Sequence, residues 1–230
     1  MLEAAATCAT TICMAAPYTI YFAGELFSLK HLVGNSLLAE ALERLSGGTY
    51  RCILPQDLEQ RETPPLSIRN QDLFYCLSAD LGLFHFDGPE LDSGTAAEFL
   101  FAKMLDIPSV ILRTDFRVAG DSSHVPWNLM LSGFPRTEIV LVDSVQAYKD
   151  QASGRRLPGA QAAQAATEEV AKLTIAALDK ARATPAVLPA DQRRAVYDWA
   201  RLFPGSGFES KVSSELLGEI LSTKVSKELL

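Results

Sequence analysis

Acidic side chains crowd one short segment of the chain, between residues 87 and 98. The four are Asp87, Glu90, Asp92 and Glu98. Carboxyl groups gathered in this way can attack a substrate or move protons, and they can also simply cap a helix. Asp92 stands where a helix is expected to begin, and an acid is favoured there by the exposed N–H groups and the positive end of the helix dipole. Helix capping alone is therefore enough to explain Asp92.

Glu98 is harder to explain by capping. It lies inside the apolar run 96–105, on an expected helix that must pack against a sheet. A buried carboxylate without a partner is costly. The side chain therefore either points to solvent on the outer face of the helix or faces a pocket, where it is kept for chemistry.

A second carboxylate, Asp72, lies on the helix expected before that one. Cleavage of a glycosidic bond requires two such groups at one pocket: one attacks the anomeric carbon and the other delivers a proton to the leaving group. On these residues alone, sugar chemistry is one candidate among several.

The elements that position these residues alternate along the chain. Short β-rich runs are expected as strands at 18–23, 50–54, 82–86, 109–112 and 138–142, and helical stretches at 29–45, 67–79, 95–105 and, more briefly, 127–131. This alternation predicts an α/β fold, a flavodoxin-like or Rossmann-like five-stranded parallel sheet with helices on both faces, plus a C-terminal helical extension. Ligands of such sheets bind beyond the carboxyl ends of the strands, which is where the acidic segment would lie.

The chain is expected to divide into three segments. Residues 1–16 are interpreted as a frayed leader, 17–150 as the α/β domain and 151–230 as the helical extension. The leader is mildly apolar but lacks the basic stretch of a signal peptide, and Met14 is a candidate second start besides Met1. The extension has helical spacing at 161–182, 190–202 and 209–230, and we interpret it as a packing or assembly surface.

Composition narrows the classes of partner. A formal charge of −7 and a pI near 5.0 argue against a nucleic acid polymer. No apolar run approaches the ~20 residues that cross a bilayer, so no membrane association is expected. The four cysteines lack the spacing of a metal site or a disulfide scaffold, which favours reduced thiols in a cytoplasmic protein. We expect no metal, because the three histidines, His31, His85 and His124, are scattered.

Several short blocks together resemble the nucleoside 2-deoxyribosyltransferase family, over residues 18–148. The blocks are residues 20–24 with Phe27, then 55–56, 70–73, 92–98 and 128–130. The resemblance implies an enzyme that transfers the 2-deoxyribosyl group between nucleobases, with deoxyribonucleosides and free nucleobases as substrates and no cofactor. It implies that Glu98 is the nucleophile, that a covalent deoxyribosyl-Glu98 intermediate forms, and that the configuration is retained.

The resemblance also implies roles for the residues around Glu98. Tyr21 would hold and tune its carboxylate, Asp72 would assist proton transfer to the base, Gln56 would help to read the base edge, and Asp92 would bind a sugar hydroxyl. Asn128 would complete the site of a neighbouring subunit and hold the 5′-hydroxyl, so a homo-oligomer is expected. The further substrate-binding residues in the matching blocks are Gly24, Phe27 and Met130.

Structural alternatives stay open for these positions. Tyr21 could be an ordinary strand aromatic, Asp72 and Asn128 could be helix caps, Gln56 could line a loop, and Met130 could belong to the core. Two other functions also stay open. One is hydrolysis of deoxynucleoside 5′-monophosphates, for which the cations and hydroxyls of the segment 113–123 would suit a phosphate. The other is a non-catalytic module that senses nucleosides or nucleotides.

Overall fold

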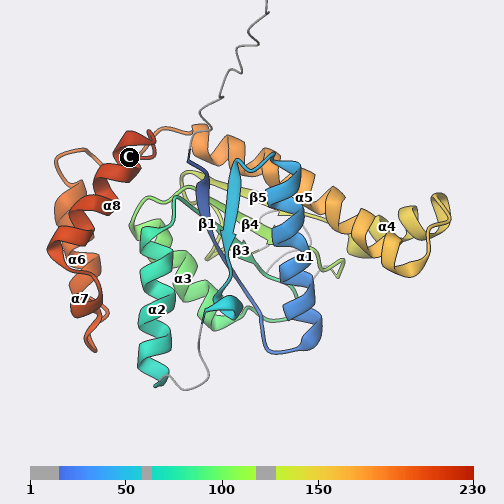
Figure 1. Cartoon of the computed structure of the whole chain (residues 1–230), viewed down its shortest axis with the longest axis horizontal. Coiled ribbons are helices and arrows are strands. Elements are labelled where there is room, and N and C mark those ends of the chain that lie inside the picture. The colour runs from blue at the N-terminus through green and yellow to red at the C-terminus, as the bar shows by residue number, and fades with distance from the viewer. Residues whose placement is uncertain (1–15, 59–63, 118–127) are drawn as a thin grey trace, which may run out of the picture.

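One parallel sheet forms the centre of the protein. The computed structural model describes residues 16–58, 64–117 and 128–230. Its strands are β1 (Tyr18–Gly24), β2 (Tyr50–Ile53), β3 (Leu81–His85), β4 (Ser109–Arg113) and β5 (Thr137–Leu141). They pair in the order β2-β1-β3-β4-β5, all parallel (Figure 1). This is the flavodoxin-like order, and it confirms the predicted fold class.

Helices cover both faces of this sheet. Those of the first part of the chain are α1 (Leu29–Leu45), α2 (Pro65–Ser78), α3 (Ser93–Met104) and the short α4 (Ser144–Lys149). Those that follow are α5 (Gly159–Ala183), α6 (Arg193–Leu202), α7 (Phe208–Lys211) and α8 (Ser214–Ser226). A 3-10 turn at Pro55–Asp57 follows β2, and a π turn at Asp150–Gly154 follows α4.

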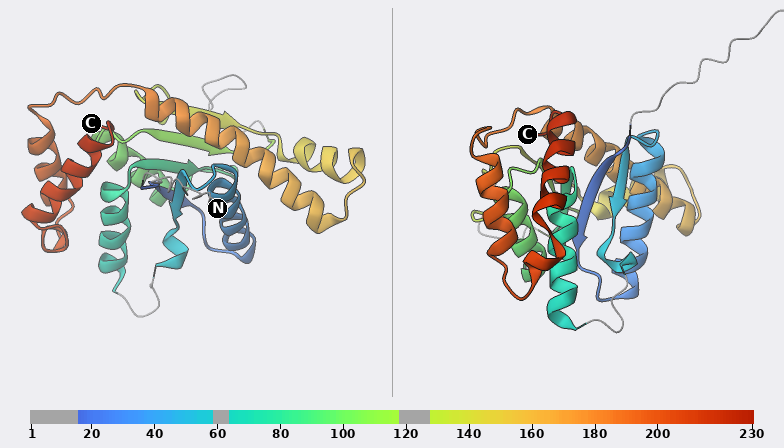
Figure 2. Two further views of the ribbon diagram at one scale, coloured as in Figure 1. Left: turned by 45° about the horizontal axis from the view of Figure 1, so that its top comes forward. Right: turned by 60° about the vertical axis from the view of Figure 1, so that its left-hand side comes forward.

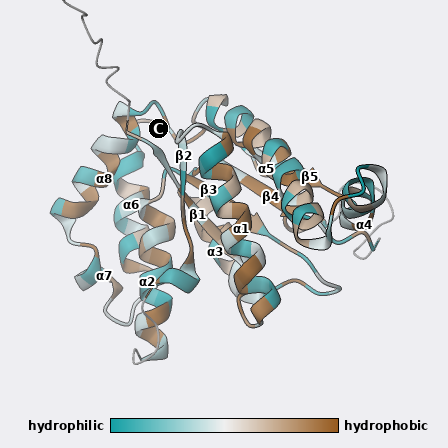
Figure 3. Cartoon of the chain, turned by 45° about the vertical axis from the view of Figure 1, so that its right-hand side comes forward, coloured by the Kyte–Doolittle hydropathy of each residue, from teal (hydrophilic) through white to brown (hydrophobic). Residues whose placement is uncertain are grey.

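The alternation of side chains along β1 shows how the sheet separates two cores. Ile20 and Phe22 face one side, where they pack with residues of α1 and α5. Tyr21 and Ala23 face the other side, where they pack with residues of α2 and α3. Hydrophobic residues are frequent in the strands at the centre of the molecule (Figure 3). We refer to these two sides as the α1/α5 face and the α2/α3 face.

On the α1/α5 face, the first helix of the expected extension is part of the covering layer. Figure 2 shows α5 running along the sheet. Its residues Val170 and Leu178 pack in one buried cluster with Leu38 and Leu42 of α1. Tyr50 of β2 also donates a hydrogen bond to Asp179 of α5, at 2.5 Å. On this face the sheet is therefore covered by α1 from the first part of the chain and by α5 from the expected extension.

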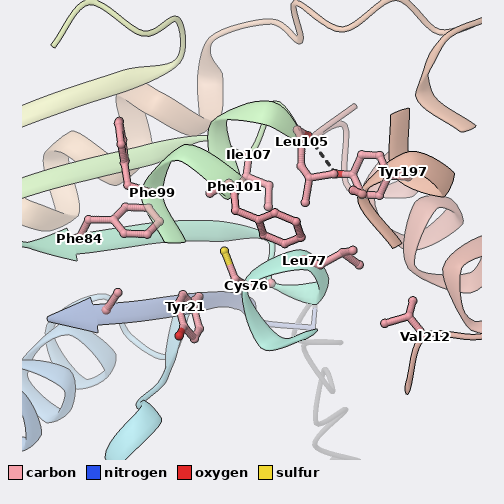
Figure 4. Close-up of a cluster of buried hydrophobic side chains, with 14 of the residues drawn as sticks. Tyr21, Cys76, Leu77, Phe84, Phe99, Phe101, Leu105, Ile107, Tyr197 and Val212 are labelled. Carbon is pink, nitrogen blue, oxygen red and sulfur yellow. Dashed lines mark hydrogen bonds between the residues drawn. The ribbon is translucent and has the colours of Figure 1, made fainter. Parts of the chain in front are cut away.

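On the α2/α3 face, the rest of the extension adds a further layer. Helices α6, α7 and α8 lie outside α2 and α3 (Figure 1). Buried side chains of this layer, Tyr197, Phe208 and Val212, join the same cluster as Phe101 of α3. The Tyr197 hydroxyl donates to the carbonyl oxygen of Leu105, at 3.0 Å, where α3 ends (Figure 4).

Polar contacts attach this outer layer to both ends of α2. The Asn70 amide donates to the carbonyl oxygen of Ser206, at 2.9 Å, and the Arg69 guanidinium donates to that of Pro204, at 3.0 Å. At the other end, the buried Lys224 ammonium donates to the carbonyl oxygen of Ala79. Helix α2 is thus bonded to the extension in its first half and at its C-terminal end.

Three local expectations need correction or completion. The described part of the expected helix at 127–131 is a turn, because the Asn128 side chain accepts from the backbone N–H groups of Met130 and Leu131 and so closes the chain locally. The expected helix at 209–230 is split into α7 and α8, and Ser213 caps the start of α8. Helix α4 had no counterpart in the expectation. The leader falls, except for Ala16, outside the described residues.

None of the helices in the described parts of the chain is long and apolar enough to span a membrane.

Candidate active site

A phenol and a carboxyl group meet on the α2/α3 face of the sheet. The Tyr21 hydroxyl donates to Oε1 of Glu98, at 2.8 Å. Tyr21 is fully buried, and its position on β1 directs it to this face because neighbouring strand residues alternate. Burial, and then the negative charges of Glu98 and Asp72, raise the pKa of Tyr21 well above its usual value, so the hydroxyl keeps its proton and acts as a donor. Tyr21 is therefore more than an ordinary strand aromatic.

Helix α3 presents Glu98 toward the sheet rather than toward solvent. Thr95, Phe99 and Ala102 are among the buried residues of this helix, and Glu98 lies on the same side at helical spacing. Burial raises the pKa of Glu98 from 4.5 to about 8. The hydrogen bond from Tyr21 opposes this rise, while the negative charge of Asp72 adds to it. Glu98 is thus a carboxyl group poised to change its charge close to neutral pH.

Asp72 is a second carboxyl group with a shifted pKa. It lies in the middle of α2, which excludes the helix-cap alternative for this residue. Burial raises its pKa from 3.8 to about 6. Its Oδ1 atom is buried and has no hydrogen-bond partner within the part of the chain that the structure describes. A buried acceptor without a partner is rare in proteins and is a sign of a site for a ligand.

Helices α2 and α3 bring the two carboxyl groups together. Cys76, one turn after Asp72, donates its thiol to the backbone oxygen of Glu98, at 3.6 Å. Figure 4 shows Cys76 of α2 between Tyr21 of β1 and the side chains of α3. The charge of Asp72 acts on both Glu98 and Tyr21, as their raised pKa values indicate.

Asp92 begins α3 and caps it. Its Oδ2 atom accepts from the backbone N–H and from the hydroxyl of Thr95, both at 2.7 Å. The capping interpretation of the sequence is therefore confirmed. The negative charge of Asp92 also contributes to the raised pKa of Glu98, which places it near the carboxyl pair.

Gln56 and Gly24 lie at the ends of β2 and β1. The Gln56 amide is bonded to α1: its Nε2 donates to the Leu32 carbonyl and the Ser36 hydroxyl, both at 2.9 Å, and its Oε1 accepts from Asn35 at 3.2 Å. Gly24 allows a close approach of strands, since a Cβ atom there would lie 3.2 Å from the Cβ of His85.

Phe27 and Met130 differ from the residues above because they are open to solvent. Their exposed fractions are 78% and 77%. The side chain of Asn128 is used locally, as its Oδ1 accepts from the Met130 N–H at 2.9 Å. These three residues have no described contact with Glu98, Asp72 or Tyr21 within this single chain.

Asp87 of the acidic segment has a structural role that the sequence analysis did not predict. Its carboxylate accepts from the backbone N–H groups of Thr114 and Asp115, at 2.6 and 3.0 Å, and lies 3.1 Å from Nε2 of His85. Burial alone would raise the pKa of Asp87, but the bonds from His85 and Thr114 outweigh burial and hold it well below its usual value. A signal was present, because Asp87 directly follows a strand and precedes Gly88 in a loop.

The two arginine side chains that could bind a phosphate already have partners within the protein. Arg113 is buried and donates to the carbonyl oxygens of Phe86 and Gly88, at 2.9 and 3.0 Å. Arg117 pairs with Asp115. The serines at 122 and 123 lie outside the described residues. Among the residues that are described, no group of three or more His, Cys, Asp or Glu side chains could hold a metal ion.

Comparison with protein families matches this site to a known group. The family model for nucleoside 2-deoxyribosyltransferase matches residues 20–130. These residues are therefore similar to a nucleoside 2-deoxyribosyltransferase domain, and they make up a little under half of the chain. The match covers Tyr21, Asp72 and Glu98, and it confirms the resemblance found in the sequence. The matched range ends before β5, so β5 and all helices after it lie outside it.

Solved structures similar to the chain are the following. A conserved protein from Enterococcus faecalis is 28% identical, over 57% of this chain and 95% of its own, with a TM-score of 0.47. A 2-deoxyribosyltransferase from Leishmania mexicana is 23% identical, over 61% and 100%, with a TM-score of 0.42. One from Bacillus psychrosaccharolyticus is 23% identical, over 50% and 80%, with a TM-score of 0.39. Comparison with curated protein sequences gives no match.

Proposed function

We propose that this protein transfers the 2-deoxyribosyl group of deoxyribonucleosides from one nucleobase to another, through a covalent intermediate on Glu98. The observation that carries the proposal is the buried pair of carboxyl groups. Glu98 is held by Tyr21, and Asp72 keeps a buried oxygen without a partner beside it. Both carboxyl groups have pKa values raised toward neutral pH, to about 6 for Asp72 and about 8 for Glu98, so the pair can hold a single proton near neutral pH.

The first step breaks the glycosidic bond. An ionised Glu98 oxygen attacks the anomeric carbon, the bond from that carbon to the base nitrogen breaks, and its electron pair leaves with the base. Asp72 gives its proton to the departing base, which leaves as a neutral molecule. The Tyr21 hydroxyl stabilises the Glu98 carboxylate before the attack.

The second step reverses the first with a different base. A nitrogen of the incoming base attacks the anomeric carbon, the ester bond to Glu98 breaks, and its electron pair returns to the carboxylate. The proton lost by the incoming base returns to Asp72. Two inversions at one carbon retain the configuration. A sugar without a 2-hydroxyl tolerates positive charge at the anomeric carbon, so the residues described suffice without a cofactor.

The active form of the carboxyl pair holds one proton. Between about pH 6 and pH 8 the pair holds one proton, and the higher pKa of Glu98 places it mostly on Glu98. The reaction proceeds from the less populated arrangement, in which Asp72 holds that proton and Glu98 is ionised. Below this window both groups are protonated and the nucleophile is lost. Above it both are ionised and the proton for the base is lost. The rate is therefore expected to follow a bell-shaped pH profile across this window.

A homo-oligomer is part of the proposal. Asn128 would complete a neighbouring site, and the exposed Leu129 and Met130 beside it would contact that neighbour. A mixture of Asn128→Ala and Glu98→Ala subunits tests this. If sites are shared, the mixture regains part of the activity that each variant lacks, whereas no recovery would mean that each subunit is self-contained.

Base exchange is the direct test of the whole proposal. The protein is incubated with deoxyinosine and each free base in turn, and new nucleosides are measured by chromatography. We expect new nucleosides from the native protein and none from Glu98→Ala or Glu98→Gln, both of which should still bind nucleoside. Activity that survives both substitutions would refute Glu98 as the nucleophile, and a strong preference for deoxynucleoside 5′-monophosphates would favour the hydrolase instead.

A further inference from the structure

A cavity of about 350 Å³ lies on the α1/α5 face, on the side of the sheet opposite to Glu98. It opens at the carboxyl ends of β3 and β4, where His85 and Thr114 line it. Its other walls come from α1, α4 and α5. The volume falls within the range of ordinary small-molecule sites.

Small side chains keep this cavity open from three helices. Gly34 of α1, Ala147 of α4, and Ala163 and Ala166 of α5 all line it. A Cβ atom built on Gly34 would meet no other atom within 4 Å. The space beside α1 is therefore open at a place where most other residues would fill it.

The polar groups of the cavity are suited to a neutral ligand. None of its described lining residues is Asp, Glu, Lys or Arg. The Thr114 hydroxyl donates its proton to Asp87 at 2.5 Å, so its remaining capacity at the strand end is to accept. The Tyr148 hydroxyl adds a group that can donate, and the rings of Tyr148 and His85 offer flat surfaces. The Asp87 charge is already paired with His85 and Thr114.

We propose that this cavity is a second small-molecule site, which binds a neutral aromatic heterocycle of about the size of a nucleobase. The ring lies between the small residues of α1 and α5, and its polar edge meets Thr114 and Tyr148. The site is separated from Glu98 by the sheet itself, because His85 and Tyr21 face opposite sides. The proposal therefore does not depend on the reaction at Glu98.

Alanine methyl groups make the test specific for this cavity. The full-length protein is labelled with ¹³C at alanine methyls and titrated with thymine, which is neutral, and with orotate, a pyrimidine of similar size that is anionic. The methyls of Ala147, Ala163 and Ala166 report on the cavity, while those of Ala96 and Ala97 report on the neighbourhood of Glu98. Thymine is expected to shift the three cavity methyls saturably, and orotate is expected to leave them in place.

A leucine at position 34 should block the cavity. Gly34→Leu is expected to weaken thymine binding at the cavity methyls by about tenfold or more, because its side chain occupies the ligand's space. Gly34→Ala is the matched control, since it changes the same helix position and leaves most of the space open. Ala166→Leu fills the cavity from the opposite wall and serves if Gly34→Leu does not fold.

Three results would overturn the proposal. These are cavity methyls that do not respond to thymine, a response to orotate as strong as that to thymine, and a response that persists in both filled variants. A shift of Ala96 and Ala97 alone would concern only the site at Glu98, so failure of this proposal and failure of the proposed reaction are seen separately.

Discussion

The same five strands present two different surfaces to their covering helices. On the α2/α3 face, Tyr21 meets Glu98 and lies near Asp72 in a largely buried polar group, and two layers of helices cover this face. On the α1/α5 face, the neighbouring residues Ile20 and Phe22 pack in a cluster of mostly aliphatic side chains, and the lining of the cavity at the strand ends holds no Asp, Glu, Lys or Arg among the described residues. A shift of one residue along β1 therefore separates a side chain that bonds a carboxyl group from side chains that pack in an apolar core.

The two faces also differ in how they contribute to the stability of the fold. Burying carboxyl groups with raised pKa values lowers the stability of the fold above the ordinary pKa of those groups. The extension compensates on that face by adding buried aromatic residues and by bonding both ends of α2. Among the described residues, the cluster on the α1/α5 face holds no such pair of carboxyl groups, and α1 and α5 cover it.

The largest effect is expected from removing an aromatic side chain of the outer layer. Phe208 is fully buried, and its ring lies edge-on to that of Phe101 of α3. Phe208→Ala should lower the free energy of unfolding by about 3–5 kcal/mol, because a cavity replaces the ring. Urea unfolding measures the change. Leu173→Ala, on the half-exposed outer side of α5, is the control and should change it little; a loss below ~1 kcal/mol for Phe208→Ala would mean that the extension does not brace the α2/α3 face.

A smaller effect on stability is expected when Glu98 is replaced by a residue that does not titrate. Its pKa is about 8 in the folded protein and 4.5 ordinarily, so its stabilising contribution is complete below pH 4.5 and is lost as the pH rises toward 8. Glu98→Gln should therefore be more stable than the native protein at pH 9, by on the order of 3 kcal/mol after allowance for partial exposure, and similar to it at pH 4.5. Thermal unfolding at pH 4.5, 7 and 9 measures this. Glu90→Gln, on the exposed loop before α3, should change nothing, and parallel pH dependence in Glu98→Gln would contradict the raised pKa.

Substitution of the second carboxyl group tests the chemistry of the α2/α3 face alone. Asp72→Asn should lower the rate of base exchange by ~10²-fold, because the amide cannot pass a proton to the base. The rate at saturating deoxyinosine measures it. Asp150→Asn, at an exposed position beyond α4, is a control that should keep the native rate. An unchanged rate in Asp72→Asn would reduce Asp72 to a structural residue.

The smallest effect is a shift of the pH profile. Tyr21→Phe removes the hydrogen bond that lowers the pKa of Glu98, so the upper limb of the bell, near pH 8, should move upward by about one to two pH units. The control lies across the sheet: Tyr50→Phe also loses a hydrogen bond to a carboxylate, that of Asp179, and should leave the limb in place. If the two variants have the same pH–rate profile, the shift does not depend on the hydrogen bond between Tyr21 and Glu98.

The strands and the site were predictable for the same reason. Buried parallel strands are short apolar runs, and each expected strand agrees with the structure to within one residue at either end. Glu98 was conspicuous because a carboxylate stood within an apolar helix. Its contact with Tyr21, implied by the family resemblance, is present in the structure.

The rest depends on contacts between distant parts of the chain. Helical spacing gave α5 and α6 their bounds approximately, but an apolar stripe does not specify its partner, so it did not show that α5 joins α1 while α6 packs beyond α3. The bonding of the Gln56 amide to α1 is similarly non-local. The break before α8 carried a local signal that was overlooked, since Ser213 precedes a run of helix formers as a capping residue does.

The position of α5 limits how this chain can be rearranged. Although it comes after the matched domain in sequence, it lies against β4 and β5 and shields Val110, Leu112 and Val140. A chain cut near residue 150 would leave those side chains bare and prone to self-association, whereas a cut after residue 183 would spare that surface and uncover α2 and α3 instead. Recombination with relatives should therefore exchange α5 together with the sheet, and only the three helices beyond it are separable as a unit.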